Sequence, residues 1–144
     1  MQFAYTTAMR ISAEIAKQAP KHTVLKDVFG FDGFRPGQEQ VIDTLLSGEN
    51  VLTVMPTGSG KSLCFQIPAL ITGGLTIVVS PLVALMEDQV AALEYAGVAA
   101  DAINSSRLRE DNIATWRRAA AGDIRLLYMA PERLMTERMI AALK

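Results

Sequence analysis

One stretch, residues 51–70, constrains this chain more than any other, because it predicts a strand, a phosphate-binding loop and a helix in that order. The apolar run at 51–55 is nearly unbroken and β-branched, as expected for a strand covered on both faces. Gly58 and Gly60 permit the backbone angles and close approach that let N–H groups point at an anion, and the following helix adds its positive N-terminal end. Lys61 is then placed to reach the β and γ phosphates of a nucleotide, and the Ser62 hydroxyl to ligate Mg²⁺.

The strict form of this loop motif, G-x-x-x-x-G-K-[ST], requires glycine where this chain has Met55. The alternative is a chance turn rich in glycine and serine, followed by a lysine that is merely solvated. Strand, glycines, Lys-Ser and helix occur together in the order that the chemistry requires, which favours the phosphate loop. Within the helix, Pro68 is expected to end or kink it near Gln66 or Ile67, and Cys64 to be a small buried hydrophobe.

Composition limits what can surround this motif. With 144 residues, half of them hydrophobic and a fifth charged, the chain fits one globular domain with a sizeable core. One cysteine excludes an internal disulfide framework, and no apolar run approaches the length that spans a bilayer, so we expect a cytoplasmic protein with no membrane partner. The formal net charge of −1 provides no bulk attraction for a polyanion. Binding to DNA would therefore require a local surface.

The chain is expected to consist of a short extension, residues 1–22, and a domain, residues 23–144. Apolar residues at helical spacing in the extension predict an amphipathic helix that Pro20 ends. His22 has no cysteine or second histidine to share a metal ion with, so it is expected at the surface.

Helices and strands alternate along the domain. An amphipathic helix is expected from Gln38, and buried strands are expected at residues 75–79, 98–103 and 124–129. Ser80 is expected to cap the helix after the first of these strands, with Pro81 at its first position, and Ser105 or Ser106 to cap the next helix. Another helix is expected near the end of the chain, from Thr136. Strands that alternate with helices of this length imply an α/β fold with parallel βαβ units.

Four stretches carry motifs that can be compared with a family: residues 29–38, with three phenylalanines among glycines, 55–70, 79–90 and 128–134. By composition alone, the first is a loop that either plugs the domain edge or contacts a ligand. Together the four resemble motifs 0, I, Ia and Ib of the first RecA-like domain of RecQ-type DNA helicases, where a residue other than glycine is usual at the Met55 position. The resemblance implies a three-layer RecA-like P-loop NTPase domain. DEAD-box RNA helicases share the loop, but their motif Ia is built on Pro-Thr-Arg-Glu-Leu, which this chain lacks, so a DNA translocase is favoured.

The resemblance implies how ATP would be bound. Phe31 would stack on adenine, while Arg35 and Gln38 would hydrogen-bond its edge, since an amide offers the donor and acceptor that adenine requires. The implied phosphate-binding residues are Pro56, Thr57, Gly58, Ser59, Gly60, Lys61, Ser62 and Leu63. Lys61 and Ser62 are the implied catalytic residues, with Ser62 as the implied Mg²⁺ ligand.

The resemblance also implies DNA contacts at Ser80, Pro81 and Arg133. A helix N-terminus behind Ser80 can bind a DNA phosphate without any net positive charge. The alternative for Arg133 is a surface ion pair with Glu132 or Glu137. Glu87 stands where many members of the family carry lysine.

Parts that such a helicase needs are expected to lie beyond this sequence. The sequence has no Walker B strand ending in Asp-Glu, which would hold Mg²⁺ and activate water, so the domain is expected to be truncated before that strand. The second RecA-like domain, a required partner that supplies the arginine finger, is also absent. We therefore expect the N-terminal piece of an ATP-dependent DNA helicase. The alternatives are a stand-alone nucleotide-binding module without hydrolysis, or another superfamily 2 nucleic-acid translocase.

Overall fold

A computed structural model describes residues 20–143, so the amphipathic helix expected before Pro20 lies outside the described residues. The chain divides into two compact units, Met1–Gly73 and Gly74–Lys144, and each is described by itself. The prediction that residues 23–144 form one incomplete RecA-like domain stays a prediction.

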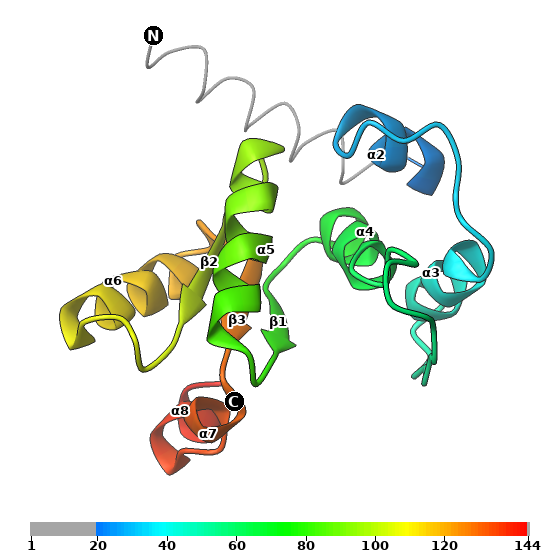
Figure 1. Ribbon diagram of the computed structural model, residues 1–144. Helices are drawn as coiled ribbons and strands as arrows, with labels where there is room; N and C mark the ends of the chain where they lie inside the picture. The colour runs from blue at the N-terminus through cyan, green and yellow to red at the C-terminus, as the bar shows by residue number, and fades with distance from the viewer. Residues whose placement is uncertain (1–19, 144) are drawn as a thin grey trace, which may run out of the picture. The chain divides into compact units, whose positions relative to one another are not determined.

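The first unit is helical in the part that the structure describes. Its helices are α2 (Lys21–Asp27), α3 (Gln38–Leu46) and α4 (Leu63–Thr72) (Figure 1). Each helix turns apolar side chains inward, and α4 packs against both α2 and α3. The buried residues include Val24, Leu25, Val41, Ile42, Ile67 and Leu70. The helix expected from Gln38 is thereby confirmed.

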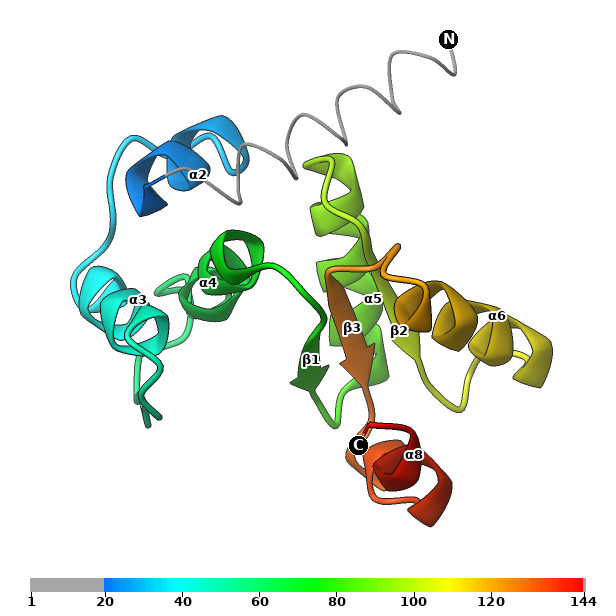
Figure 2. The ribbon, with the colours of Figure 1, turned by 180° about the vertical axis from the view of Figure 1, so that it is seen from behind.

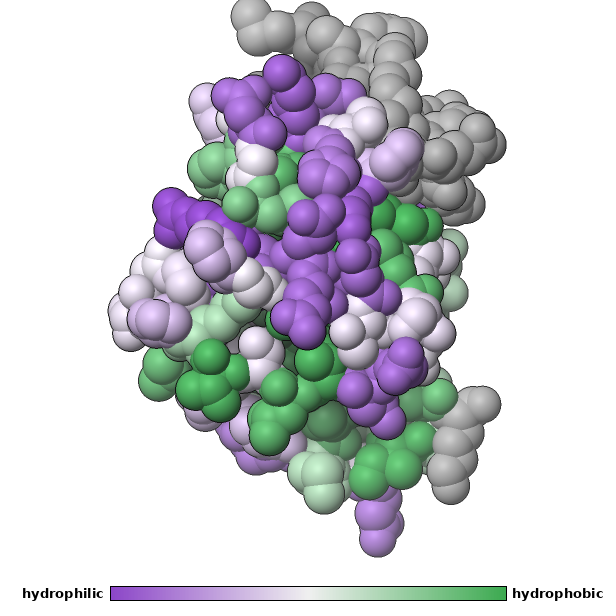
Figure 3. Space-filling model, turned by 90° about the vertical axis from the view of Figure 1, so that its right-hand side faces the viewer, coloured by the Kyte–Doolittle hydropathy of each residue, from purple (hydrophilic) through white to green (hydrophobic). Residues whose placement is uncertain are grey.

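The strand expected at residues 51–55 is wrong for this structure, which has irregular backbone there. Leu52 and Val54 are each 93% exposed, whereas the prediction required both faces to be covered. A strand needs a neighbour to take its backbone hydrogen bonds, and the described part of the first unit contains only helices and loops. Hydrophobic side chains accordingly reach the molecular surface, as they do on the face that Figure 3 shows.

The expectation that Pro68 ends the helix is also wrong, because α4 continues through it to Thr72, while the alternative that it kinks the helix stays a prediction. Proline removes one helix hydrogen bond, but residues 66–70 are all buried, and this packing favours the continued helix. Thr72 Oγ1 donates to the Pro68 carbonyl at 2.8 Å in the last turn. Cys64 is buried, as expected, and burial raises the pKa of its thiol.

The second unit is an α/β fold around three parallel strands in the order β1-β3-β2, which confirms the predicted class. Met129 at the end of β3 lies opposite Val79 of β1 and Ile103 of β2, so the carboxyl ends of all three strands are level. Helix α5 lies in front of β3 in Figure 1 and behind it in Figure 2, and α7 and α8 follow the carboxyl end of β3. The elements are β1 (Thr76–Val79), α5 (Val83–Tyr95), β2 (Ala100–Ile103), α6 (Arg109–Ala120), β3 (Leu126–Met129), α7 (Pro131–Leu134) and α8 (Glu137–Ala142).

Two of the expected helix caps are wrong. Leu82 is the N-cap of α5, so Ser80 and Pro81 precede the helix, and the Ser80 hydroxyl accepts a hydrogen bond from the Leu82 N–H at 3.4 Å. Leu108 is the N-cap of α6 in place of Ser105 or Ser106, because the turn before it is closed by other hydrogen bonds. Thr136 does cap α8, accepting from the Met139 N–H at 3.3 Å.

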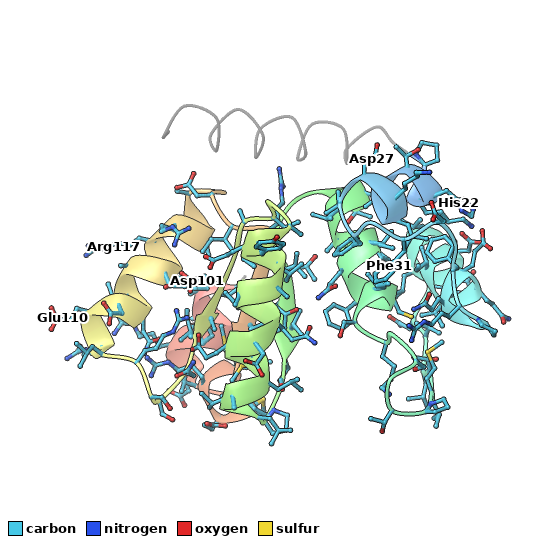
Figure 4. All side chains as sticks on the ribbon, turned by 45° about the horizontal axis from the view of Figure 1, so that its top comes forward. His22, Asp27, Phe31, Asp101, Glu110 and Arg117 are labelled. Atoms are coloured by element: carbon cyan, nitrogen blue, oxygen red, sulfur yellow. The ribbon has the colours of Figure 1, made fainter. Side chains whose placement is uncertain are left out.

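A buried carboxylate, Asp101, joins β2 to α6 (Figure 4). Its side chain is 12% exposed, and it accepts hydrogen bonds from Thr115 Oγ1 at 2.8 Å and Arg118 Nη1 at 3.0 Å. Arg107 donates to the same carboxylate and, through Nε and Nη2, to both oxygens of Glu87 on α5, at 3.0 and 2.8 Å. Three elements of the second unit thus share one charge network.

This network shifts the ionisation of its members. Burial by itself would raise the pKa of Asp101, but hydrogen bonds from Arg107, the Ala102 N–H and Thr115 outweigh it and lower that pKa. The Arg107 hydrogen bond lowers the pKa of Glu87 against a smaller effect of burial. Because both carboxyl pKa values are below their unfolded values, the stabilisation is complete above the ordinary carboxyl range and is lost as pH falls through the lowered values.

We predict that Asp101→Asn in the intact protein weakens the second unit by about 3 kcal/mol at neutral pH, because it removes one partner of a buried charge network. Hydrogen exchange of the β2 and β3 amides would measure the loss, with the exposed Asp123→Asn as the matched control. The difference from wild type should shrink as pH falls below about 4. A difference that stays constant with pH would contradict the lowered pKa of Asp101.

Candidate nucleotide-binding site

The glycine loop before α4 has the backbone that an anion site requires. Gly58 and Gly60 have φ values of +78° and +77°, in the left-handed region that favours glycine. Ser59 N–H donates to the Pro56 carbonyl at 3.3 Å, and Leu63 N–H donates to the Gly60 carbonyl at 3.2 Å. The loop is therefore a pair of tight turns that lead directly into the helix.

Gln38, the first residue of α3, binds the main chain of this loop through its side-chain amide. Its side chain is buried, and its Nε2 donates to the carbonyls of Ser59 at 3.2 Å and Gly60 at 2.9 Å. Its Oε1 accepts from the Arg35 N–H at 2.8 Å. One amide thus binds two successive carbonyls of the loop and connects them to the Arg35 main chain.

A side chain at Gly60 would meet the Gln38 amide, which would have to move away from the loop. A Cβ atom built on Gly60 would lie 2.5 Å from Gln38 Nε2. Glycine is therefore favoured at this position both by its positive φ and by the contact with Gln38.

The Lys61 side chain and the polar groups of the loop are of the kinds that bind a phosphate group. Lys61 Nζ donates to the carbonyls of Met55 at 3.0 Å and Pro56 at 2.8 Å, which places it across the loop. Ser59 Oγ is buried without a hydrogen-bond partner among the described residues. The N–H groups of Gly60 and Lys61 have no main-chain acceptor within residues 20–143. Ser62 is the N-cap residue of α4, so its hydroxyl lies at the positive end of that helix.

The residues expected to bind adenine lie on the segment that precedes α3. Arg35 donates from its guanidinium to the Gly58 carbonyl, so it touches the loop directly. Phe31 lies between α2 and α3 with 48% of its surface exposed (Figure 4). Pro56 and Thr57 are exposed at the start of the loop, while Leu63 is half-buried as the first residue of α4. The described residues do not test these roles.

His22, by contrast, is a surface residue, as expected. Its Nε2 lies 2.9 Å from Glu39 Oε1, and its ring meets Phe34 edge-on at a centroid distance of 5.0 Å. No group of three metal-binding side chains of the His, Cys, Asp and Glu types occurs among residues 20–143.

The residues expected to contact DNA lie in the second unit. Ser80 directly follows β1, and its N–H donates to the Met129 carbonyl at 3.1 Å, while Pro81 beside it is exposed. Arg133 is exposed on α7. Within the described residues it forms no ion pair with Glu132 or Glu137, so the structural alternative for this arginine is not found.

Comparison with known proteins assigns this chain to a family. The sequence matches the DEAD/DEAH box helicases over residues 35–143, which include the glycine loop, Gln38 and Arg133. The chain belongs to this helicase family. The match also covers all three strands of the second unit.

Its relatives specify the branch of the family. The chain is 48% identical over 124 residues to a protein named ATP-dependent DNA helicase RecQ from Haemophilus influenzae, covering 86% of this chain and 20% of the relative. It is 50% identical over 113 residues to the RecQ helicase of Pasteurella multocida, covering 78% and 18%, and 42% identical over 123 residues to that of Bacillus subtilis, covering 85% and 21%. The resemblance to RecQ-type helicases is confirmed. The chain spans about a fifth of the length of these relatives.

The sequence analysis did not predict that several polar residues form hydrogen bonds or ion pairs within the protein. Gln38 was expected at adenine, but its amide is occupied by the loop and by Arg35. Glu87, notable only for replacing a lysine, instead pairs with Arg107. Asp101 carried a signal that could have been used, because a carboxylate inside a short apolar strand requires a partner.

We predict that Gly60→Ala in the intact protein weakens ATP binding at least tenfold. The added methyl group meets Gln38 Nε2 and forces the loop away from its N–H geometry, in addition to the strain of a positive φ. Gly48→Ala is the matched control, since its φ is +83° but nothing lies within 4 Å of the added atom. Binding of a fluorescent ATP analogue would compare the two; equal affinities in both variants would contradict the importance of the Gln38 contact.

Proposed function

We propose that this chain is the ATP-binding part of an ATP-dependent DNA helicase, in which hydrolysis drives translocation on DNA and its unwinding. One observation carries the proposal: the glycine loop, fixed by Gln38, leads into α4 with Lys61 lying across it. Free N–H groups, a helix N-terminus and a lysine at one loop suit a nucleoside triphosphate. The names of the RecQ relatives support the same activity.

The phosphates would be bound by groups that this chain already places together. Lys61 Nζ would exchange the carbonyls of Met55 and Pro56 for oxygens of the β and γ phosphates. Mg²⁺ bound with ATP would neutralise charge on those oxygens, and the Ser62 hydroxyl would be its ligand from this chain. The unpartnered Ser59 hydroxyl and the N–H groups of Gly60 and Lys61 would complete the cradle.

Base recognition is proposed for Phe31, Arg35 and Gln38. Phe31 offers a half-exposed ring to adenine, and Arg35 reaches the loop. Because both N–H donors of the Gln38 amide are engaged by the loop, it donates to adenine only if it exchanges a bond to the loop for one to the base. Binding of the base and the arrangement of the phosphate loop would then be coupled through one side chain.

In this proposal, the rest of the protein supplies the other catalytic groups that ATP hydrolysis requires. The carboxylate that activates water and the arginine finger of a second RecA-like domain are the missing catalytic groups. The isolated chain would therefore hydrolyse ATP negligibly. A stand-alone binding module is the less favoured alternative. We propose the cytoplasm as its compartment; no helix among the described residues is long and apolar enough to cross a membrane.

We predict that Lys61→Ala in the intact protein abolishes DNA-stimulated ATP hydrolysis, because it removes positive charge at the transferring phosphate. Steady-state phosphate release would measure this loss. Lys26→Ala is the control in the same unit, since Lys26 forms only an exposed pair with Asp32 at 3.1 Å. Hydrolysis that persists in the Lys61 variant at the level of the control would refute the proposed site.

We predict that Arg133→Ala flattens the salt dependence of single-stranded DNA binding by about 0.7 in the slope of log affinity against log salt, the value for one phosphate contact. All sequences should weaken alike, because phosphates carry no sequence information. The control is Arg125→Ala, which precedes the amino end of β3 and donates to the Gly74 carbonyl at 3.2 Å. An unchanged slope in the Arg133 variant would remove this residue from the DNA site.

A further inference from the structure

The second unit contains a cleft of about 770 Å³, and of its lining residues only Arg133 has a role in the proposed helicase chemistry. It opens beside the carboxyl ends of β2 and β3, where Asn104 and Ala130 follow the strands, and it is bounded by α6, α7 and α8. Figures 1 and 2 show α6 on one side of this end of the unit and the α7–α8 pair beyond the strands. All lining residues belong to the second unit.

One face of α6 forms a wall of the cleft. Arg109, Ile113, Trp116 and Arg117 line it at the i, i+4, i+7 and i+8 spacing of a single helical face. An adjacent face of the helix is buried through Thr115 and Ala119, and Asn112, which is also buried, lines the cleft as well. The apolar residues of the wall remain accessible: Ile113 is 37% exposed and Trp116 is half-buried. Met139 of α8 and Ile103 of β2 also line the cleft, and together with Ile113 and Trp116 they form its apolar floor.

The rim of the cleft is strongly basic. Five arginines and one carboxylate, that of Glu132, line it, although the whole chain has a formal net charge of −1. Arg107 is committed to Glu87 and Asp101. The other four have no hydrogen-bonded acceptor among residues 20–143: Arg109, Arg117, Arg133 and Arg138. The cleft thus combines an apolar floor with unpaired guanidinium groups.

The wall between β2 and α6 is rigid before any ligand binds. Asn112 Nδ2 donates to the Asn104 carbonyl at 2.9 Å, and Asn104 Nδ2 donates to Glu87 Oε1 at 2.8 Å. Arg107 also donates to the Ala102 carbonyl at 2.8 Å. A preformed wall lowers the entropy that binding must overcome.

These features favour an acidic amphipathic peptide over nucleic acid. Single-stranded nucleic acid is bound by successive aromatic faces, whereas this floor is aliphatic apart from one tryptophan that packs partly into the core. Trp, Met and Arg are enriched at protein interfaces, and apolar anchors with a charged rim suit a helix laid in a groove. We propose that the cleft between α6 and α8 binds an acidic amphipathic helix of a partner protein, with apolar side chains on Ile113 and Met139 and carboxylates on Arg109, Arg117 and Arg138.

The test uses the intact protein and a fluorescein-labelled peptide of about fourteen residues, four helical turns. Its leucines follow the i, i+3, i+4, i+7 spacing and its glutamates occupy the other face. A scrambled isomer has the same composition without an apolar face. We expect saturable binding by anisotropy with a Kd of roughly 10–100 μM, typical of a transient contact, and at least fivefold weaker binding of the scrambled isomer.

Two variants separate charge from apolar contact. Arg109→Gln with Arg138→Gln should weaken peptide binding about tenfold and flatten its salt dependence, while Arg125→Gln should leave both unchanged. Ile113→Ser should weaken the peptide about fivefold without altering the salt dependence, because it removes only an apolar anchor.

Three results would overturn the proposal. The first is no binding of the amphipathic peptide, and the second is equal binding of the scrambled isomer, which would reduce the cleft to a general anion surface. The third is a lower salt slope for single-stranded DNA in the Arg109 and Arg138 double variant, with unchanged peptide binding, which would assign these arginines to nucleic acid.

Discussion

The buried amide of Gln38 is the interaction on which the first unit's chemistry depends. It binds the Ser59 and Gly60 carbonyls, and a Cβ atom at position 60 would displace it, in addition to the strain of a positive φ. In the proposed site, the carbonyls are bonded to Gln38, and the N–H groups of Gly60 and Lys61, which have no main-chain acceptor among residues 20–143, would bind an anion. The same amide is anchored at its oxygen by the Arg35 N–H, which connects the loop to the segment proposed for base recognition. In the proposed site, a single side chain would thereby connect the residues that bind phosphate to those that bind the base.

The second unit depends on a different kind of constraint, a buried carboxylate. Asp101 would be costly within an apolar strand without partners, and Arg107, Thr115 and Arg118 offset that cost. Arg107 and Arg118 are paired within this network, whereas the other four arginines that line the cleft have no hydrogen-bonded acceptor among the described residues. A chain with almost no net charge thus presents a concentrated positive surface, as binding to anionic partners requires.

Much of this structure follows from sequence because the relevant signals are local. Glycines at positive φ, apolar periodicity in α3 and α5, and short apolar runs in β1 and β3 each act within a few residues. The errors arose where distant partners decide the outcome. Residues 51–55 resemble a strand but lack a neighbour in their unit, and Pro68 stays helical because the surrounding side chains are buried. Ser80 does not cap α5, because its hydroxyl accepts a hydrogen bond from the Leu82 N–H in the turn before that helix. The site residues could be named from a motif, but the hydrogen bonds from Gln38 to the Ser59 and Gly60 carbonyls could not be predicted from it.

In the proposed site, the loop that Gln38 binds holds the triphosphate of ATP through Lys61 and the loop N–H groups. A crystal structure of the intact protein with Mg²⁺ and a non-hydrolysable ATP analogue tests this most directly. The account predicts that Lys61 Nζ leaves the Met55 and Pro56 carbonyls and lies within hydrogen-bond distance of the β and γ phosphates, while Gln38 Nε2 stays on the loop or turns to the base. Phosphates bound elsewhere, with Lys61 still on its two carbonyls, would contradict it.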